Sequence, residues 1–339
     1  AILIKQAQDN QIKKILLLAE VNHELQKSID LANNNPFDGF LLYKLQYSDL
    51  SSLSKAFSAE QVDAVTSAIL SIENDRSYIL GDQTGIGKGR SLAGMLRYSL
   101  INGFRPVFFT RNAQLFNDLW RDIVDTGTDK FISNPFIFNS DGFITHKDKV
   151  VYSPMKTSDI YNLDRIGNQF DIIFSTYSQF SGRSGKKENL FLSSIDKNTL
   201  LFLDESHVAA SGESNISRFL SVVKERTGPT YHSSATDRKK ANNLLFYSDI
   251  FPASFKGQLK SLIENKPSNE LLEAISMALV KDGVFLRREH DFSKLEFRTY
   301  HASTQYQTAS RELSDQLAQV LSKMAYLCLL YTSLSGLAM

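Results

Sequence analysis

The strongest constraint on the fold is a short apolar run that leads directly into a glycine-rich turn. Residues 77–80 predict a buried strand, the segment through Leu96 predicts a helix, and the turn between them contains Gly85 and Gly87. These glycines let the backbone curl so that its N–H groups point at phosphate oxygens, and Lys88 would neutralise phosphate charge. The alternative is a glycine-rich turn beside a solvated lysine, but the strand-turn-helix context favours a phosphate site.

Further apolar runs alternate with helical patterns, which predicts an α/β fold with a parallel sheet covered on both faces. Strands are predicted at 106–110, 171–176, 200–204 and 284–286, and helices at 58–69 and 115–124. Ser58 and Gln61 form a capping-box pattern. Residues 1–33 predict helix, with a break at Asn33–Pro36 and a linker to about 50. We therefore expect a helical segment over 1–50, the sheet domain over 51–300 with an irregular insertion at 126–169, and a helical tail over 301–339.

Composition excludes several classes of protein. A net charge of +1 gives no overall attraction to nucleic acid or membrane, so any such contact needs a local surface. The single cysteine, Cys328, excludes an internal disulfide and a cysteine zinc site. There is no signal-peptide pattern, and the most apolar stretch, 324–339, is too short to span a bilayer. We expect a cytoplasmic protein of a bacterial or phage-infected cell, or a nuclear one in a eukaryote, with no membrane partner. Because the chain starts at Ala1, we expect a piece of a longer protein.

Two carboxylates follow the predicted strand 200–204. Parallel strands bring their carboxyl ends to one sheet edge, so Asp204 and Glu205 should lie near the glycine-rich turn. Asp204 suits a hold on Mg²⁺, and Glu205 suits the base that activates water. A standard phosphate loop has Ser or Thr directly after its lysine as a metal ligand. Here Gly89 stands at that place, so Mg²⁺ must use other ligands or water.

Three motifs occur in a characteristic order: Asp-x-Thr-Gly-x-Gly-Lys at 82–88, Asp-Glu-x-His at 204–207 and Ser-Ala-Thr at 234–236. They resemble motifs I, II and III of superfamily 2 helicases. Gly-Lys-Gly-Arg at 87–90 resembles the strawberry notch helicase-like family more closely, and 117–123 resembles its motif Ia helix. The resemblance covers about 51–300.

The resemblance implies the first RecA-like lobe of a motor that uses ATP and Mg²⁺. It assigns catalysis to Lys88, Asp204, Glu205 and His207, and coupling to Ser234, Ala235 and Thr236. It assigns nucleotide contact to Gln61, Thr84, Gly85, Ile86, Gly87, Lys88, Gly89 and Arg90. Such motors complete their site with an arginine from a second lobe. After residue 300 only Arg311 is present, so we expect that lobe to be a partner outside this chain.

Nucleic acid, DNA rather than RNA, is the expected partner. Its phosphates would meet side chains near strand ends and in basic loops: Arg111, Thr176, Lys186, Lys187 and Lys239, with Lys240 beside it. A solvated loop is the alternative reading of these lysines, and Arg287-Arg288 is expected to be a polar strand end. Two other functions stay open: a nucleotide-dependent interaction module that separates no strands, and a P-loop phosphotransferase.

Overall fold

The computed structural model of the chain divides into two compact units, 1–289 and 290–339. The second unit contains a helical segment at 308–320. The predicted boundaries near 50 and 300 stay predictions. The structure describes residues 2–83, 85–181, 185–210, 214–234, 243–252, 255, 259, 261–262, 268–289, 304, 306 and 308–320.

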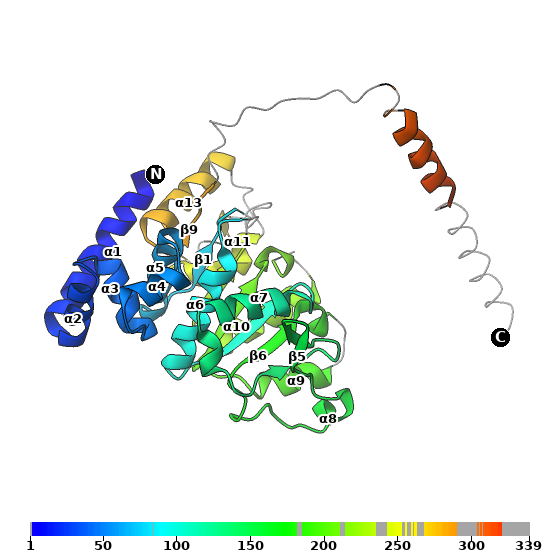
Figure 1. Cartoon of the computed structure of the whole chain (residues 1–339), viewed down its shortest axis with the longest axis horizontal. Coiled ribbons are helices and arrows are strands. Elements are labelled where there is room, and N and C mark those ends of the chain that lie inside the picture. Colours follow the sequence, from blue (N-terminus) through cyan, green and yellow to red (C-terminus); the bar gives the residue numbers. More distant parts are fainter. Residues whose placement is uncertain are drawn as a thin grey trace. The chain divides into compact units, whose positions relative to one another are not determined.

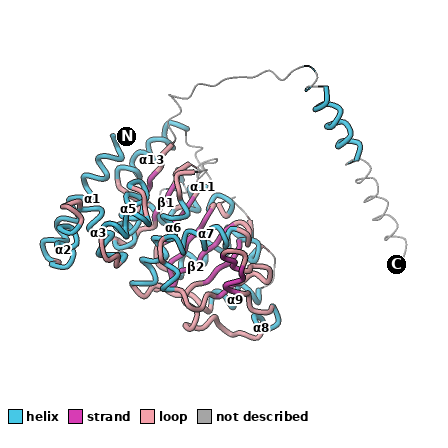
Figure 2. The backbone as a smooth tube through the Cα atoms, viewed as in Figure 1, coloured by secondary structure: helices cyan, strands magenta, loops and turns pink. Residues whose placement is uncertain are grey.

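Seven parallel strands form one sheet within the described part of the first unit (Figure 2). Their spatial order is β3 (Phe136–Ile137), β6 (Ile173–Thr176), β2 (Arg105–Thr110), β7 (Thr199–Asp204), β8 (Thr230–Ser233), β1 (Tyr78–Leu80) and β9 (Phe285–Leu286). The predicted α/β fold with a parallel sheet flanked by helices is confirmed. β3 and β8 were not predicted as strands.

Alternate side chains of each strand enter two separate cores, because successive residues of a strand point to opposite faces. Phe108 and Phe202 belong to one core, and Phe109 and Leu203 to the other. The first core is covered by α1 (Ile2–Val21), α2 (His23–Leu31), α3 (Pro36–Leu45), α4 (Leu50–Ala56), α5 (Ala59–Glu73), α6 (Lys88–Ile101) and α7 (Leu115–Asp125) (Figure 1). The second is covered mainly by α9 (Gly185–Leu192), α10 (Asn215–Arg226) and α13 (Asn269–Lys281).

The N-terminal region is more helical than the sequence predicted. The single helix expected over 1–33 is two, because Asn22 ends the first and caps the second with its side chain. The linker expected up to about 50 is wrong. Asn35 caps α3 and Pro36 occupies its first turn, where a missing N–H is harmless. Phe40 and Leu41 are then buried in the core.

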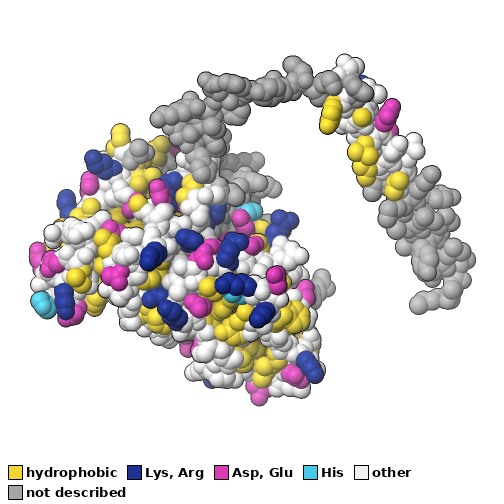
Figure 3. Space-filling view, in the orientation of Figure 1, with side chains coloured by type: hydrophobic (Ala, Val, Ile, Leu, Met, Phe, Trp, Pro, Cys, Tyr) yellow, Lys and Arg dark blue, Asp and Glu magenta, His cyan; other side chains and the backbone are white. Residues whose placement is uncertain are grey.

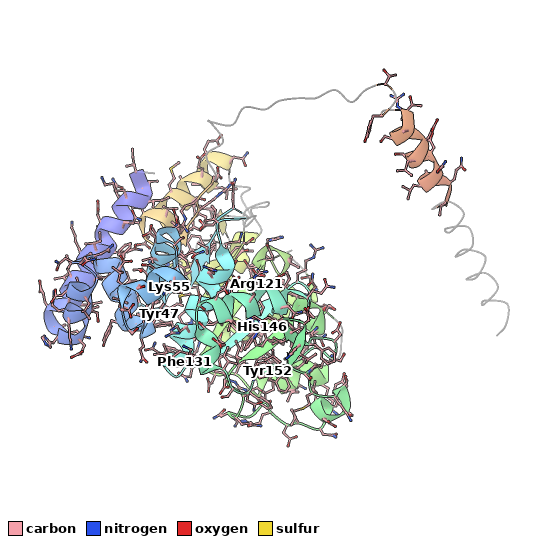
Figure 4. The ribbon with its side chains drawn as sticks, in the orientation of Figure 1. Tyr47, Lys55, Arg121, Phe131, His146 and Tyr152 are labelled. Carbon is pink, nitrogen blue, oxygen red and sulfur yellow. The ribbon has the colours of Figure 1, made fainter. Side chains whose placement is uncertain are left out.

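Arg97 fastens this N-terminal region to α6. Its guanidinium donates hydrogen bonds to the carbonyls of Leu45, at 2.6 Å, and of Gly127, at 2.9 Å. It also lies 4.2 and 4.7 Å from the ring centroids of Tyr47 and Phe131, the two residues labelled in Figure 4. The helix that starts at Lys88 is therefore anchored at its far end from two sides.

The insertion expected at 126–169 contains a 3₁₀ turn (Thr128–Phe131), the edge strand β3, an antiparallel hairpin of β4 (Ile144–His146) and β5 (Lys149–Tyr152), and the short α8 (Thr157–Tyr161). The hairpin packs on α7. Asn117 accepts a 2.7 Å hydrogen bond from the Thr145 N–H, and the rings of Trp120 and Tyr152 meet edge to face at 5.2 Å. The remaining described elements are α11 (Asn243–Phe246) and 3₁₀ turns at Tyr177–Phe180, Ser206–Val208 and Ser248–Ile250. None of the described helices is long and apolar enough to cross a membrane.

Candidate functional site

The turn after β1 depends on two glycines with positive φ. Gly85 has a φ of 95° and Gly87 a φ of 88°, a region that other residues rarely adopt. Gly87 is also the N-cap of α6 and supplies no side-chain cap, so the first N–H groups of that helix keep their hydrogen-bonding capacity. A helix N-terminus of this kind attracts phosphate. Ile86 lies within the turn, where its N–H donates to the Gln83 carbonyl at 3.4 Å.

Lys88 and Asp82 tie this turn together. The Lys88 Nζ donates to the Asp82 carbonyl at 2.9 Å. The Asp82 carboxylate is buried and pairs with the Arg288 guanidinium, and it accepts a 2.8 Å bond from the Arg288 N–H. Burial is the largest effect and lowers the pKa of Arg288, but the hydrogen bonds to Asp82 and the attraction of nearby negative groups together raise it. Arg288, expected to be a polar strand end, therefore fixes the turn to β9.

Gln61 connects α5 to the same turn. Its Oε1 accepts from the Ser58 N–H at 2.9 Å, which confirms the predicted capping box, and its Nε2 donates to the Gly87 carbonyl at 3.2 Å. A β-carbon on Gly87 would lie 2.3 Å from that Nε2. Both polar atoms of Gln61 are thus engaged within the protein. The predicted contact with adenine stays a prediction.

Asp204 ends β7 beside the turn. The Thr110 hydroxyl donates to its Oδ2 at 3.1 Å, and the Tyr177 hydroxyl donates to its backbone carbonyl at 2.7 Å. Burial and the neighbouring Glu205 charge raise the pKa of Asp204, while hydrogen bonds from Thr110 and Ser233 oppose the rise. A carboxylate oriented in this way, with no ion pair to a cation among the described residues, is suited to a divalent metal.

Glu205 has left-handed backbone angles, with φ 48° and ψ 45°. Its Oε2 lies 3.2 Å from Nδ1 of His207, and the same Nδ1 lies 2.9 Å from Oγ of Ser234. These three side chains form a continuous connection from the end of β7 to the end of β8. Ala235 and Thr236, the other predicted coupling residues, lie outside the described residues, as does Thr84.

A cavity of about 330 Å³ opens between the turn and the carboxylates, within the range for small-molecule sites. Its walls include Gly85, Gly87, Lys88, Gly89, Asp118, Asp122, Asp204 and Glu205. Backbone donors and a cation thus face carboxylates across one space, a set that fits a nucleotide polyphosphate and its metal. Within the described residues no three His, Cys, Asp or Glu side chains converge to hold a metal alone, so phosphate oxygens would have to complete the coordination.

The predicted nucleic-acid residues are scattered. Arg111 is exposed just after β2. Lys186 and Lys187 begin α9, where the Lys187 Nζ donates to Gln179 Oε1 at 2.5 Å. Thr176 is buried, and its hydroxyl accepts from Asn139 Nδ2 at 2.9 Å, so the predicted contact has no accessible surface. Lys239 and Lys240 lie outside the described residues, and the role of all these residues stays a prediction.

Basic side chains gather over the region of α6 and α7 on the face seen in Figure 3, with acidic ones between them. Arg90, predicted to contact nucleotide, pairs with Asp125 at 2.7 Å, and Arg121 pairs with Asp118 at 3.5 Å. The first pair joins α6 to α7, the second lies within α7, and both balance positive with negative charge.

Sequence reasoning missed three features of the site. Thr110 follows an apolar strand and looked like its ordinary polar end. Asp122 was noted only as part of a helix that resembles motif Ia. The Asp82–Arg288 pair joins residues 206 positions apart. The one signal in the sequence was Gly89, because it lacks the hydroxyl that usually serves as one of the metal ligands.

Known proteins similar to this chain include human protein strawberry notch homolog 2, 23% identical over 275 residues, which covers 74% of this chain and 18% of that protein. Protein strawberry notch of Drosophila melanogaster is 26% identical over 199 residues, 54% of this chain and 11% of that protein. The chain thus spans less than a fifth of the length of these curated relatives.

Two solved structures show more distant similarity. The Sulfolobus solfataricus SWI2/SNF2 ATPase core in complex with dsDNA has a TM-score of 0.47 and 15% identity, over 68% of this chain and 44% of that one. The UvsW helicase from bacteriophage T4 has a TM-score of 0.37 and 19% identity, over 56% of each chain.

A family model described as P-loop containing NTP hydrolase pore-1 matches residues 23–312. The match includes the glycine-rich turn, both carboxylates and the whole sheet. The resemblance to the strawberry notch proteins that the sequence predicted is confirmed. The chain belongs to the family of P-loop containing NTP hydrolases of the pore-1 type.

Proposed function

We propose that this chain binds ATP with Mg²⁺ in the cavity of about 330 Å³ and hydrolyses it, as the first lobe of a superfamily 2 helicase-like motor. The observation that carries the proposal is the meeting of Lys88 with Asp204 and Glu205 around one cavity. Membership of an NTP hydrolase family supports the reaction class.

Each residue has a chemical role in this proposal. Lys88 leaves the Asp82 carbonyl, which it contacts at 2.9 Å, to meet β- and γ-phosphate oxygens. Asp204 lies where it would hold the Mg²⁺, which neutralises phosphate charge when bound. Glu205 orients the attacking water and accepts its proton. The Glu205–His207–Ser234 connection, with contacts of 3.2 and 2.9 Å, supports transmission of the nucleotide state to β8.

We also propose nucleic acid, DNA rather than RNA, as the surface along which the motor moves or which it remodels. Support comes from the order of the three motifs and from the resemblance of residues 117–123 to motif Ia. A phosphotransferase would need only the phosphate loop, whereas the link from His207 to Ser234 is a helicase-type feature.

The test compares nucleotide binding by the chain with binding by Lys88→Ala and by Lys55→Ala, an exposed lysine on α4 that serves as a control. Loss of a charged hydrogen bond to phosphate should weaken binding about tenfold or more for Lys88→Ala only. Equal affinity of Lys88→Ala and the parent chain would contradict the proposed site. Turnover that rises with added DNA, measured in a protein that carries both lobes, separates a motor from an interaction module. Transfer of phosphate to an acceptor would identify a phosphotransferase.

A further inference from the structure

Gly89 has no side chain at the position where P-loop enzymes usually carry a metal-binding hydroxyl. In P-loop enzymes the residue after the lysine is Ser or Thr, and its hydroxyl binds Mg²⁺. A β-carbon built on Gly89 would lie 2.0 Å from Oδ2 of Asp122 and 3.1 Å from its Cγ. The carboxylate of Asp122 therefore occupies the space that the usual side chain would take.

Asp122 is held there by the packing of α7. On either side of it, Trp120 and Ile123 are buried in the core. The insertion adds the edge-to-face contact of Trp120 with Tyr152 at 5.2 Å. One turn further, Asp125 pairs with Arg90 of α6 at 2.7 Å. The position of the carboxylate beside Gly89 is thus set by a rigid helix pair.

The Asp122 carboxylate makes no direct polar contact within the described part of the chain. It accepts no hydrogen bond and forms no ion pair there, and Arg90 and Arg121 pair with Asp125 and Asp118 instead. These two arginines attract its charge without touching it, but burial is the larger effect and raises the pKa of Asp122. The carboxylate is only partly accessible and lines the same cavity as Lys88 and Asp204. A partly buried carboxylate without a direct contact is unfavourable, and a hard divalent cation would relieve it.

We propose that Asp122 replaces the missing hydroxyl and provides the oxygen that holds the Mg²⁺ of the bound nucleotide on the α6 side. This inference rests on the proposed nucleotide binding. Mg²⁺ in nucleotide sites is held by one or two carboxylates together with substrate phosphates. Asp204 supplies one carboxylate from β7, and Asp122 supplies a second from α7.

A carboxylate in place of a neutral hydroxyl has an electrostatic signature. It adds one negative charge next to the polyphosphate, so it repels nucleotide that carries no metal and attracts nucleotide that does. Removing the charge should therefore change the two affinities in opposite directions. A residue with a merely structural role would lower both.

The first experiment measures the affinity of ADP and of a non-hydrolysable ATP analogue by calorimetry, in EDTA and in Mg²⁺. The chain is compared with Asp122→Asn, which keeps the shape, and with Asp118→Asn, which removes a charge lining the same cavity. The increase in nucleotide affinity that Mg²⁺ produces should be about 10- to 100-fold smaller in Asp122→Asn than in the parent chain, a usual loss when support of a metal is weakened. In EDTA, Asp122→Asn should bind nucleotide as well as the parent chain or better. Asp118→Asn should lose clearly less of the Mg²⁺-dependent gain, because Arg121 already pairs with the Asp118 carboxylate at 3.5 Å.

The second experiment moves the ligand back to its usual place. Gly89→Ser alone should not improve Mg²⁺-dependent nucleotide binding, because its β-carbon would overlap the Asp122 carboxylate. In Gly89→Ser with Asp122→Ala the space is open, since the β-carbon of Asp122 is 3.9 Å from that position, an ordinary contact distance. The double variant should recover Mg²⁺-dependent binding that Asp122→Ala lacks.

The outcomes separate the two proposals. A full Mg²⁺-dependent gain in Asp122→Asn, or an equal loss in Asp118→Asn, would overturn the role of Asp122. No recovery in the double variant would do the same. If the parent chain binds no nucleotide even with Mg²⁺, the proposed function itself is wrong.

Discussion

Glu205 combines an unfavourable backbone with a chemically useful position. Its φ of 48° lies in the left-handed region, which costs a non-glycine residue of order 1–3 kcal/mol. In return its carboxylate lies 3.2 Å from His207 and faces the cavity. Such strain persists only where the surrounding structure imposes it, and it is common at active sites. The strain supports a functional reason for a glutamate at this position.

Replacing Glu205 with Gln should separate binding from chemistry. The amide keeps the shape but accepts no proton, so turnover should fall by about 10²-fold or more, the usual contribution of a general base. Nucleotide affinity should stay unchanged, because the base acts on water in the transition state. Steady-state hydrolysis in a protein that carries both lobes, together with nucleotide titration, tests this. Glu225→Gln, on the exposed end of α10, is the control, and near-normal turnover by Glu205→Gln would refute the assignment.

The sequence predicted individual residues well where local order defines their chemistry. The turn with Gly85 and Gly87 could be identified because strand, turn and helix are adjacent in the chain. Asp122 could not be identified in this way. Its position beside Gly89 depends on how α7 packs on α6, and nothing in its local sequence distinguishes it from other polar residues of an amphipathic helix.

Elements were predictable where one apolar pattern determines them, and less so where polar groups are buried. α5, α6 and α7 follow helical periodicity, and β2 and β7 each contain an unbroken apolar run between polar ends. β8 was missed because His232 lies fully buried in it. That ring pairs with Asp249 at 3.3 Å, and Asp249 also pairs with Lys224 at 2.5 Å. The charged residues beside the buried ring, Asp249 and Lys224, belong to two other elements. The sequence of β8 alone therefore does not show why it can be a buried strand.

The contact between α1 and α5 should be sensitive to pH through Asp63. Burial raises the pKa of Asp63 to about 6, although Gln8 of α1 donates to its Oδ2 at 2.8 Å. The unfolded chain ionises this group near 3.8, so the folded state loses stability as pH rises from about 4 to about 6. Asp63→Asn should therefore raise the melting temperature at about pH 7.5 and have much less effect near pH 4.

Thermal melts at the two pH values measure this difference. Asp9→Asn, at an exposed position of α1, serves as the control. A change in melting temperature that is the same at both pH values would mean that the charge of Asp63 is not the cause.

The start of α9 carries the predicted contact with nucleic-acid phosphates. Neutralising Lys186 and Lys187 together should lower the slope of log affinity against log salt by up to about two, roughly one for each lost phosphate contact. Lys187 already donates to Gln179 at 2.5 Å, so it must exchange that bond and can contribute less. Titrations with DNA of unrelated sequences at several salt concentrations test this. Lys13 and Lys14, exposed on α1, provide a matched double variant, and an unchanged slope for α9 would exclude the contact.

At the scale of the whole molecule, the proposed site needs a second lobe, because none of the described residues that line the cavity is an arginine. We predict that the chain alone binds ATP and hydrolyses it slowly. In related P-loop enzymes such an arginine is worth about 10³- to 10⁵-fold in rate. The comparison is turnover by the chain with and without a second lobe added in trans or joined in cis. Full turnover by the isolated chain, stimulated by nucleic acid, would mean that the site is complete and that the superfamily 2 assignment must be replaced.

The order of the strands could not be predicted from the sequence, because it also depends on contacts between distant residues. Short connections and right-handed crossovers limit the possible arrangements, but they do not say which late strands flank β1. In the structure these are β8 and β9. Their choice depends on side chains such as Asp82 and Arg288, which are 206 positions apart in the chain.

That separation has a consequence for synthesis. Ribosomes add about 5–20 residues per second, so Arg288 follows Asp82 after about 10–40 s. Until residue 233 is added β1 has neither of its neighbours, and until residue 288 is added the buried carboxylate of Asp82 lacks its cation. If the proposed site needs this pair, nucleotide binding begins only after translation has passed residue 288. We therefore expect a product truncated before Arg288 to bind no ATP.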